Sequence, residues 1–364
     1  MARTPLTLAA LATSAVPGLT VAGVREHRGS GDDEFHSAVL ETERGMVIIR
    51  VPRNGVAEVR QSSELLGLSA LSEGARASLP FDVPRTLGVT RAGDTRAVVT
   101  SFLSGWPLER LTGQDEDAED GIESSLAQAL AAIHALPTSL VHDAGLPVRS
   151  AEEARHHVHR LVERAVSTHL VPETVHQRWR EALGRAQLWD FAPVVVHGSL
   201  SLGHILQTED RVSGVLGWDA LAVDDPALDF AWLLGSGEET LAAVHARYAA
   251  LSGTSGVREA EARAHLYHQL EVAKWLLHGV DTHDAAIVED AVAMFDRLVD
   301  RLSHLGEPVP ARHVLGEREV ARLLDEVPEL PVDPRSETAE FESLDEGREF
   351  DRGSRAGDEP PREP

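Results

Sequence analysis

The pattern of apolar residues changes from that of strands to that of helices beyond Gln114, and this change limits the folds open to the chain. Between residues 20 and 103, alternating and β-branched runs are separated by Gly and Asp or Asn turns, with one helical stretch near 56–71. Such runs predict an antiparallel sheet that carries a single helix. Further along, apolar residues recur every three or four positions, as at Ile122 and Leu126, which is the period of a helix. We therefore predict an α+β fold with a small antiparallel-sheet lobe followed by a large helical lobe.

The expected elements divide the chain into four parts: a lead-in at 1–19, the small lobe at 20–104, the large lobe at 105–305 and a tail at 306–364. In the small lobe we expect strands at 21–27, 38–41, 46–51 and 96–103. In the large lobe we expect a helix from residue 122 that Pro137 stops, and further helices at 151–170, 173–188, 227–234, 238–251, 257–278 and 285–305. A short β insert at 194–216 interrupts these helices. It forms the first part of the segment 194–232, which contains the candidate functional residues of this lobe.

The two ends of the chain have a different composition from the middle. The apolar start, Leu6 to Val16, has the look of a weak secretion signal, but a short helix ended by Pro17 and Gly18 is the favoured interpretation. From about residue 328 the chain is rich in Glu, Asp, Arg, Gly and Pro and poor in apolar residues. Such a segment buries too little apolar surface to fold, so we expect disorder there.

Charge and composition exclude several classes of protein. The formal net charge is -25 and Lys274 is the only lysine, so no basic face is expected for nucleic acid. The longest apolar runs fall short of the roughly 18 to 20 residues that cross a bilayer, so we expect no membrane partner. The chain has no cysteine, which fits a reducing compartment. We predict a soluble, cytoplasmic protein.

The segment 194–232 reads VVVHGSLSLGHILQTEDRVSGVLGWDALAVDDPALDFAW and is similar to one motif of the aminoglycoside and macrolide phosphotransferases. Those families have a strand ending in His-Gly-Asp, an Asn or His five positions after the Asp, a hairpin, and then Ile-Asp-Trp. The corresponding positions here are His197, Gly198, Ser199, His204, Leu216, Gly217 and Trp218. Further similarity lies at 49–53, 131–137, 143–145 and 223–229, with a resemblance to the macrolide enzymes in particular.

The resemblance implies a bilobal protein-kinase-like fold and a set of site residues. It places His197, Ser199 and His204 at the catalytic positions, and Gly217 at the position of the acid that binds the metal ion. It places the nucleotide, ATP or GTP, against Arg50 and the linker Ser101, Phe102 and Leu103. The acid that pairs with Arg50 is left open between Glu58 and Glu64. Asp225 and Asp229 are expected to hold the backbone and His197.

The chain departs from the family at the two acids that the chemistry requires. Phosphoryl transfer needs a group that orients the acceptor hydroxyl and carboxylates that hold Mg²⁺ against the phosphates. Serine at position 199 is not an anionic base near neutral pH, and glycine at position 217 has no side-chain ligand. Loss of a general base alone costs about 10²- to 10⁴-fold in rate. We therefore expect impaired catalysis and no metal site. The nearby acids that could compensate are Asp219, Asp224 and Asp225, and Asp219, two positions past Gly217, is the first candidate.

Three functions remain open. The first is a pseudokinase, a kinase-fold protein without phosphotransfer that binds a nucleotide, a small molecule or a protein partner of unknown identity. The second is an active ATP- or GTP-dependent O-phosphotransferase that acts on a macrolide-type hydroxyl through a non-standard acid. The third is a purely structural protein whose pockets have closed. No motif names the acceptor.

Three other patterns have plain interpretations. The glycines of residues 29–33 fit a hairpin tip better than a phosphate-covering loop. His156 and His159 share a helix face, but no further metal ligands accompany them, so we expect a solvated surface. Ser201 lies in a Gly-x-Ser-x-Gly-like run, but Ser199 stands where the first position of the hydrolase elbow needs Gly.

Overall fold

The computed structural model describes residues 4–27, 34–111, 121–253 and 256–304. The predicted disordered tail and the glycine-rich run at 29–33 lie outside the described residues. No helix in the described ranges is long and apolar enough to cross a membrane.

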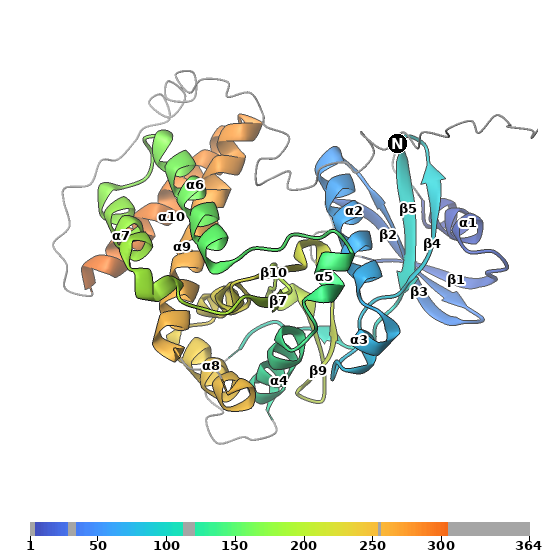
Figure 1. Cartoon of the computed structure of the whole chain (residues 1–364). Coiled ribbons are helices and arrows are strands. Elements are labelled where there is room, and N and C mark those ends of the chain that lie inside the picture. Colours follow the sequence, from blue (N-terminus) through green and yellow to red (C-terminus); the bar gives the residue numbers. More distant parts are fainter. Residues whose placement is uncertain (1–3, 28–33, 112–120, 254–255, 305–364) are drawn as a thin grey trace, which may run out of the picture. The chain divides into compact units, whose positions relative to one another are not determined.

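The small lobe is an antiparallel sheet of five strands in the order β1-β2-β3-β5-β4 (Figure 1). The strands are β1 (Val21–Glu26), β2 (Phe35–Thr42), β3 (Gly45–Pro52), β4 (Thr86–Ala92) and β5 (Thr95–Ser101). The central strand β3 alternates buried Val47, Ile49 and Val51 with less buried neighbours, which is the pattern of a strand with one face on a core. The α+β prediction is confirmed, although the sequence did not indicate β4.

The helix α1 (Pro5–Ala15) forms at the start of the chain, as the pattern favoured. Thr4 caps it by accepting a hydrogen bond from the Thr7 amide at 3.3 Å, and proline occupies its first position, where no amide donor is needed. Its buried residues share one hydrophobic cluster with the sheet, so α1 covers a sheet face (Figure 1). The packing is close at Gly88 on β4, where a Cβ would lie 2.1 Å from the Ala15 carbonyl oxygen.

The helix α2 (Gly55–Ala70) connects the small lobe to the segment that carries the motif. Asn54 caps it through its side-chain oxygen, which accepts from the Ala57 amide at 2.8 Å. One turn before its end, α2 approaches Trp218 so closely that a Cβ at Gly67 would lie 2.0 Å from the Trp218 carbonyl oxygen. Only glycine permits this approach.

The large lobe is helical with a small β insert, as predicted. Its helices are α4 (Ile122–His134), α5 (Ser139–Asp143), α6 (Ala151–Ser167), α7 (Glu173–Gly184), α8 (Glu238–Ser252), α9 (Val257–Thr282) and α10 (Ala285–His304), and a short α3 (Glu73–Ala77) precedes β4. The insert comprises a pair, β7 (Val194–Val196) with β10 (Ala222–Asp224), and a three-stranded sheet of β6 (Trp106–Pro107), β8 (Ile205–Thr208) and β9 (Arg211–Val215). The large lobe also contains four 3₁₀ helices in the described residues: η1 (Ala186–Trp189), η2 (Leu202–His204), η3 (Trp218–Ala220) and η4 (Pro226–Gly235).

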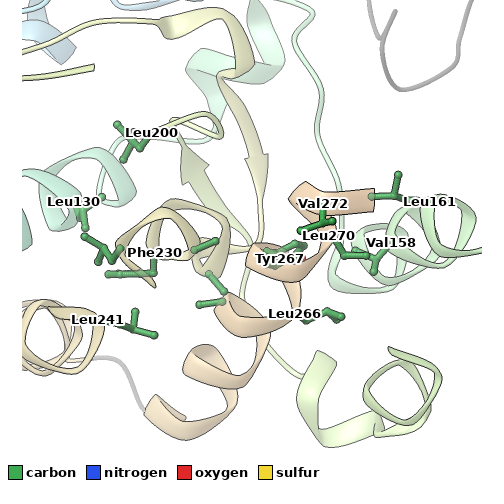
Figure 2. Packing of buried hydrophobic residues seen from close by; sticks show 14 of the residues in the cluster. Leu130, Val158, Leu161, Leu200, Phe230, Leu241, Leu266, Tyr267, Leu270 and Val272 are labelled. Atoms are coloured by element: carbon green, nitrogen blue, oxygen red, sulfur yellow. The ribbon is translucent and has the colours of Figure 1, made fainter. Parts of the chain in front are cut away.

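The large lobe has one hydrophobic cluster that joins its helices to the β insert. Figure 2 shows Leu130 of α4, Phe230 of η4 and Leu241 of α8 on one side of it, and Val158 of α6 with Leu270 of α9 on the other. Burial of each such side chain contributes about 1.5–3 kcal/mol to folding. The motif segment is thus anchored on a packed core.

Candidate functional site

The His-Gly turn after β7 is held by the buried carboxylate of Asp229. Its two oxygens accept from the backbone amides of His197 at 2.8 Å and Gly198 at 2.7 Å. His134 donates to the same carboxylate at 3.1 Å, and the Tyr248 hydroxyl bonds the other ring nitrogen of His134 at 2.9 Å. Burial acts to raise the pKa of Asp229, but the hydrogen bonds and the neighbouring histidines outweigh it and hold that pKa below its usual value. Asp229 is therefore an ionised anchor for this turn, in the scaffolding role expected of it.

His197 is fully buried, and its side chain forms a hydrogen bond with the backbone. Its Nε2 donates to the Leu216 carbonyl oxygen at 2.9 Å, which ties the end of β7 to the residue before Gly217. Burial lowers the pKa of His197 to about 4, against the opposing charge of Asp229. The ring is therefore neutral at physiological pH and fixes the distance between positions 197 and 216.

The hydroxyl of Ser199 forms a hydrogen bond with the protein backbone. The Oγ donates to the Gly217 carbonyl oxygen at 3.1 Å. The Ser199 carbonyl oxygen in turn accepts from Nδ1 of His204 at 2.7 Å. Burial lowers the pKa of His204, so its Nδ1 carries the proton and its Nε2 a lone pair. The three predicted positions 199, 204 and 217 therefore lie together as one hydrogen-bonded group.

Gly217 adopts a left-handed conformation, with φ +78° and ψ 44°. A Cβ at this position would lie 2.7 Å from Nε2 of His204 and within 2.9 Å of two ring carbons. Real Cβ atoms do not approach other atoms so closely, so a side chain at position 217 requires the His204 ring to move. Position 217, where the resemblance puts the metal-binding acid, therefore has neither a side-chain ligand nor free space beside it.

Asp219, the first candidate for a substitute acid, forms an ion pair with an arginine of α2. The Arg60 Nε lies 3.4 Å from Asp219 Oδ2, and the Arg60 Nη1 lies 2.7 Å from Glu34 Oε2 at the start of β2. Burial raises the pKa of Asp219, while Arg60 opposes that rise. Sequence reasoning missed Arg60, although its position four residues before Glu64 puts both on one helix face.

The residues present do not fit a magnesium ion held as the family resemblance implies. Mg²⁺ takes oxygen ligands in octahedral geometry and is bound through carboxylates and phosphates. Here position 217 has no side chain, the Ser199 hydroxyl is bonded to backbone, and Asp219 is paired with Arg60. No group of three or more His, Asp or Glu side chains in the described part of the chain is arranged to hold a metal ion.

The partner of Arg50 is Glu64, which the sequence had left open between two acids. Arg50 on β3 forms an ion pair and hydrogen bond with the nearly buried carboxylate of Glu64 on α2. Gln61, one turn earlier on the same helix face, donates to the Arg50 carbonyl oxygen at 3.2 Å. Gln61 lies three residues from both Glu58 and Glu64, so helical spacing alone could not choose between the two acids.

The predicted linker residues lie away from this ion pair. Ser101 ends β5 and faces Val47 across the sheet, three residues from Arg50 along β3, or about 10 Å. Phe102, 36% exposed, and Leu103 follow it toward β6. Arg50 and the linker therefore border the same strand at two different points.

Comparisons with known proteins agree with this arrangement. The viomycin phosphotransferase of Streptomyces vinaceus is 26% identical over 265 residues, which cover 67% of this chain and 88% of that protein. The structure of a type I macrolide 2'-phosphotransferase is 28% identical, with a TM-score of 0.64, covering 81% of this chain and 98% of the other. An aminoglycoside 2'-phosphotransferase solved with GDP has a TM-score of 0.65 at 18% identity, covering 83% and 99%, and shares the fold.

The expected kinase-like fold and the resemblance to the macrolide and aminoglycoside enzymes are confirmed by these matches. The family model described as the phosphotransferase enzyme family matches residues 29–267. That range holds Arg50, Glu64, the 194–232 segment and Asp229 in the order and setting described above. The chain belongs to the phosphotransferase enzyme family.

Proposed function

We propose that this protein is a pseudokinase: a member of the phosphotransferase family that binds a nucleotide or a small molecule but is impaired in phosphoryl transfer. The observation that carries the proposal is the group formed by Ser199, His204 and Gly217. In that group both acidic positions lack a carboxylate, and the space beside Gly217 is filled by the His204 ring.

The chemistry of this group supports impairment at two steps. The Ser199 hydroxyl donates its proton to a carbonyl, so it is not oriented to accept a proton from an incoming hydroxyl. Position 217 has no carboxylate that would hold Mg²⁺, the ion that would neutralise charge developing on the phosphates. Each defect alone slows the reaction by orders of magnitude.

Binding of a nucleotide is supported by the part of the site that is intact. The guanidinium of Arg50 is fixed by Glu64 and is suited to a phosphate through its planar fork of donors. In the linker Ser101 to Leu103, the Ser101 and Phe102 amides donate to the Arg85 and Met46 carbonyls, so a base would bind the other backbone groups, which do not depend on side-chain identity. A relative of the same fold was solved with GDP. We infer that ATP or GTP is the ligand class and, since the chain has no cysteine, that the protein acts in the cytoplasm.

The test combines calorimetric titration of ATP and GTP with an assay of phosphate transfer to macrolides and aminoglycosides. We expect the unaltered protein to bind nucleotide and to transfer no phosphate above background. A restored variant with Ser199→Asp, His204→Asn and Gly217→Asp should gain magnesium-dependent nucleotide binding. His204→Asn belongs in the set because a side chain at 217 needs the ring's space.

The matched control carries Asn in place of both new Asp residues, which keeps the volumes and removes the charges. Gain of magnesium dependence in this control would show that space, and not carboxylate, is limiting. Magnesium-dependent phosphate transfer by the unaltered protein would overturn the proposal.

The alternative is an active O-phosphotransferase that uses Asp219, with a macrolide-type acceptor by analogy with the macrolide 2'-phosphotransferase. The observation in its favour is that burial raises the pKa of Asp219, which brings this carboxyl closer to the range of a general base. The ion pair with Arg60 stands against it. If the alternative holds, Asp219→Asn abolishes turnover, whereas the impaired form has no turnover to lose.

A further inference from the structure

The side chain of Arg60 lies near position 217, where the family resemblance puts the acid that binds the metal ion. Arg60 reaches from α2 to Asp219, which is two residues past Gly217, and to Glu34 at the start of β2. Its side chain is 44% exposed. Its Nη2 has no hydrogen-bond partner within residues 4–27, 34–111, 121–253 and 256–304. Among the described residues, nothing therefore competes with a ligand for Nη2.

The carboxylates Glu64, Asp219 and Glu34 are each paired with an arginine. Arg60 and Glu64 both act electrostatically on His204, so the four groups Arg50, Glu64, Arg60 and Asp219 surround one region. Glu34 also pairs with Arg60, so two arginines and three carboxylates there have a formal sum of -1. Each of these carboxylates has an arginine partner, and the cation beside Asp219 and Glu34 is Arg60.

Arg60 also has the chemistry that a phosphate receptor requires. A guanidinium presents five donors in a planar fork, stays charged at all physiological pH values, and matches phosphate oxygens in a bidentate manner. The Nε to Asp219 distance of 3.4 Å is long for a charge-assisted hydrogen bond. A phosphate oxygen at ordinary distance is therefore a stronger partner for Nε than Asp219 is.

We propose that Arg60 takes the role that the resemblance gives to magnesium, and binds the phosphates of a nucleoside diphosphate or triphosphate directly, without a metal ion. The proposal rests on the proposed function, because it assumes that a nucleotide binds. In it, the phosphate replaces the Asp219 carboxylate on the Arg60 guanidinium, so one anion is exchanged for another.

The experiment is calorimetric titration of the full chain with ADP and ATP, in EDTA and in Mg²⁺. We expect dissociation constants in the two buffers to agree within about twofold. The variant Arg60→Met should weaken binding about tenfold or more, since a hydrogen bond to a charged group contributes about 1.5–3 kcal/mol. Arg160→Met is the matched control, because Arg160 is exposed on α6 and the change in charge is the same. Its binding should match that of the unaltered protein.

A second variant should change nucleotide affinity in the opposite direction. Asp219→Asn removes the competing anion and should tighten metal-free binding several-fold, with Asp94→Asn, an exposed residue between β4 and β5, as control for the change in charge. If Asp219 were instead a metal ligand, the same change would weaken binding and remove its magnesium dependence. Thermal melting of each variant establishes that it is folded before it is titrated.

The outcomes separate this inference from the proposed function. Binding that requires Mg²⁺, or binding unchanged in a folded Arg60→Met variant, overturns the role of Arg60 and leaves a nucleotide-binding protein. Absence of ADP and ATP binding in both buffers overturns the nucleotide site itself, and the inference with it. Metal-independent binding that Arg60→Met weakens and Asp219→Asn tightens supports both.

Discussion

At the scale of single residues, Ser199 and Gly217, which stand where the resemblance puts two acids, share one set of contacts with His204. The Ser199 hydroxyl bonds the Gly217 carbonyl, His204 bonds the Ser199 carbonyl, and the ring fills the space beside Gly217. The Ser199 hydroxyl and Nδ1 of His204 each have a backbone partner, whereas Nδ1 of the neighbouring His197 is buried without a hydrogen-bond partner among the described residues. Positions 199, 204 and 217 thus form one packed, hydrogen-bonded group.

Gly217→Ala tests this packing. The methyl group meets the His204 ring, and the left-handed φ of +78° strains any residue with a Cβ, so we expect a loss of about 1–3 kcal/mol in the free energy of unfolding. Denaturant unfolding monitors it. Gly184→Ala on α7, where a Cβ meets nothing within 4 Å, is the control and should be neutral or stabilising. Equal losses in the two variants would contradict the packing argument.

A buried ion pair links η4 to α9. The Arg263 Nε lies 2.6 Å from Asp225 Oδ2, the Tyr267 hydroxyl donates to the same oxygen at 3.0 Å, and Arg263 also bonds the Leu188 carbonyl at 2.7 Å. Both ionic side chains are at most 3% exposed. Asp225, expected to hold the backbone, caps η4 and also holds this pair.

Removal of one partner should be more harmful than removal of both. Arg263→Met leaves a buried, unpaired carboxylate and should cost about 3–5 kcal/mol in unfolding free energy. The double variant Arg263→Met with Asp225→Asn should recover part of that loss. A double-mutant cycle in urea measures the coupling, and strictly additive losses would count against a coupled pair.

At the scale of elements, α2 is the piece on which the site depends. Three residues of α2 make contacts at the site. Glu64 pairs with Arg50, Arg60 pairs with Asp219, and Gly67 lies against the Trp218 carbonyl. All three contacts come from one face of one helix, so the orientation of α2 sets the site geometry.

Gly67→Ala tests the docking of α2. The added Cβ would lie 2.0 Å from a backbone oxygen, which cannot rotate away, so the helix or η3 must shift. We expect about 1–3 kcal/mol of destabilisation and weaker nucleotide binding. Gly55→Ala, at the start of the same helix with open space around it, should leave both quantities unchanged. A Gly67→Ala protein with unaltered melting and binding would refute the close docking.

At the scale of the whole molecule, buried histidines couple stability to pH. Burial lowers the pKa of His197 to about 4, from 6.5 in an exposed chain, and burial also lowers the pKa of His204 and His245. A depressed pKa means that the unfolded chain binds protons first, so stability is full above about pH 6.5 and falls toward pH 4. His197 alone accounts for a loss on the order of 3 kcal/mol over that window.

Unfolding free energies measured in urea at pH 7, 6 and 5 should therefore decline. The variant His197→Asn should show a shallower decline, and His142→Gln, at an exposed position, should follow the unaltered protein. Stability that stays flat from pH 6.5 to pH 5 would contradict neutral burial of these rings.

The sequence alone predicted the order of the two lobes, the helices of the large lobe and the missing acids at Ser199 and Gly217. These follow from local periodicity and from residue identity within one short segment. The sequence did not indicate β4, whose residues alternate only weakly between exposed and less exposed positions. The pairs Arg50 with Glu64 and Arg60 with Asp219 were decided by tertiary structure alone, because Arg60 and Asp219 lie 159 residues apart. The same holds for the His204 ring over Gly217, because only the folded chain shows which space a glycine leaves and what fills it.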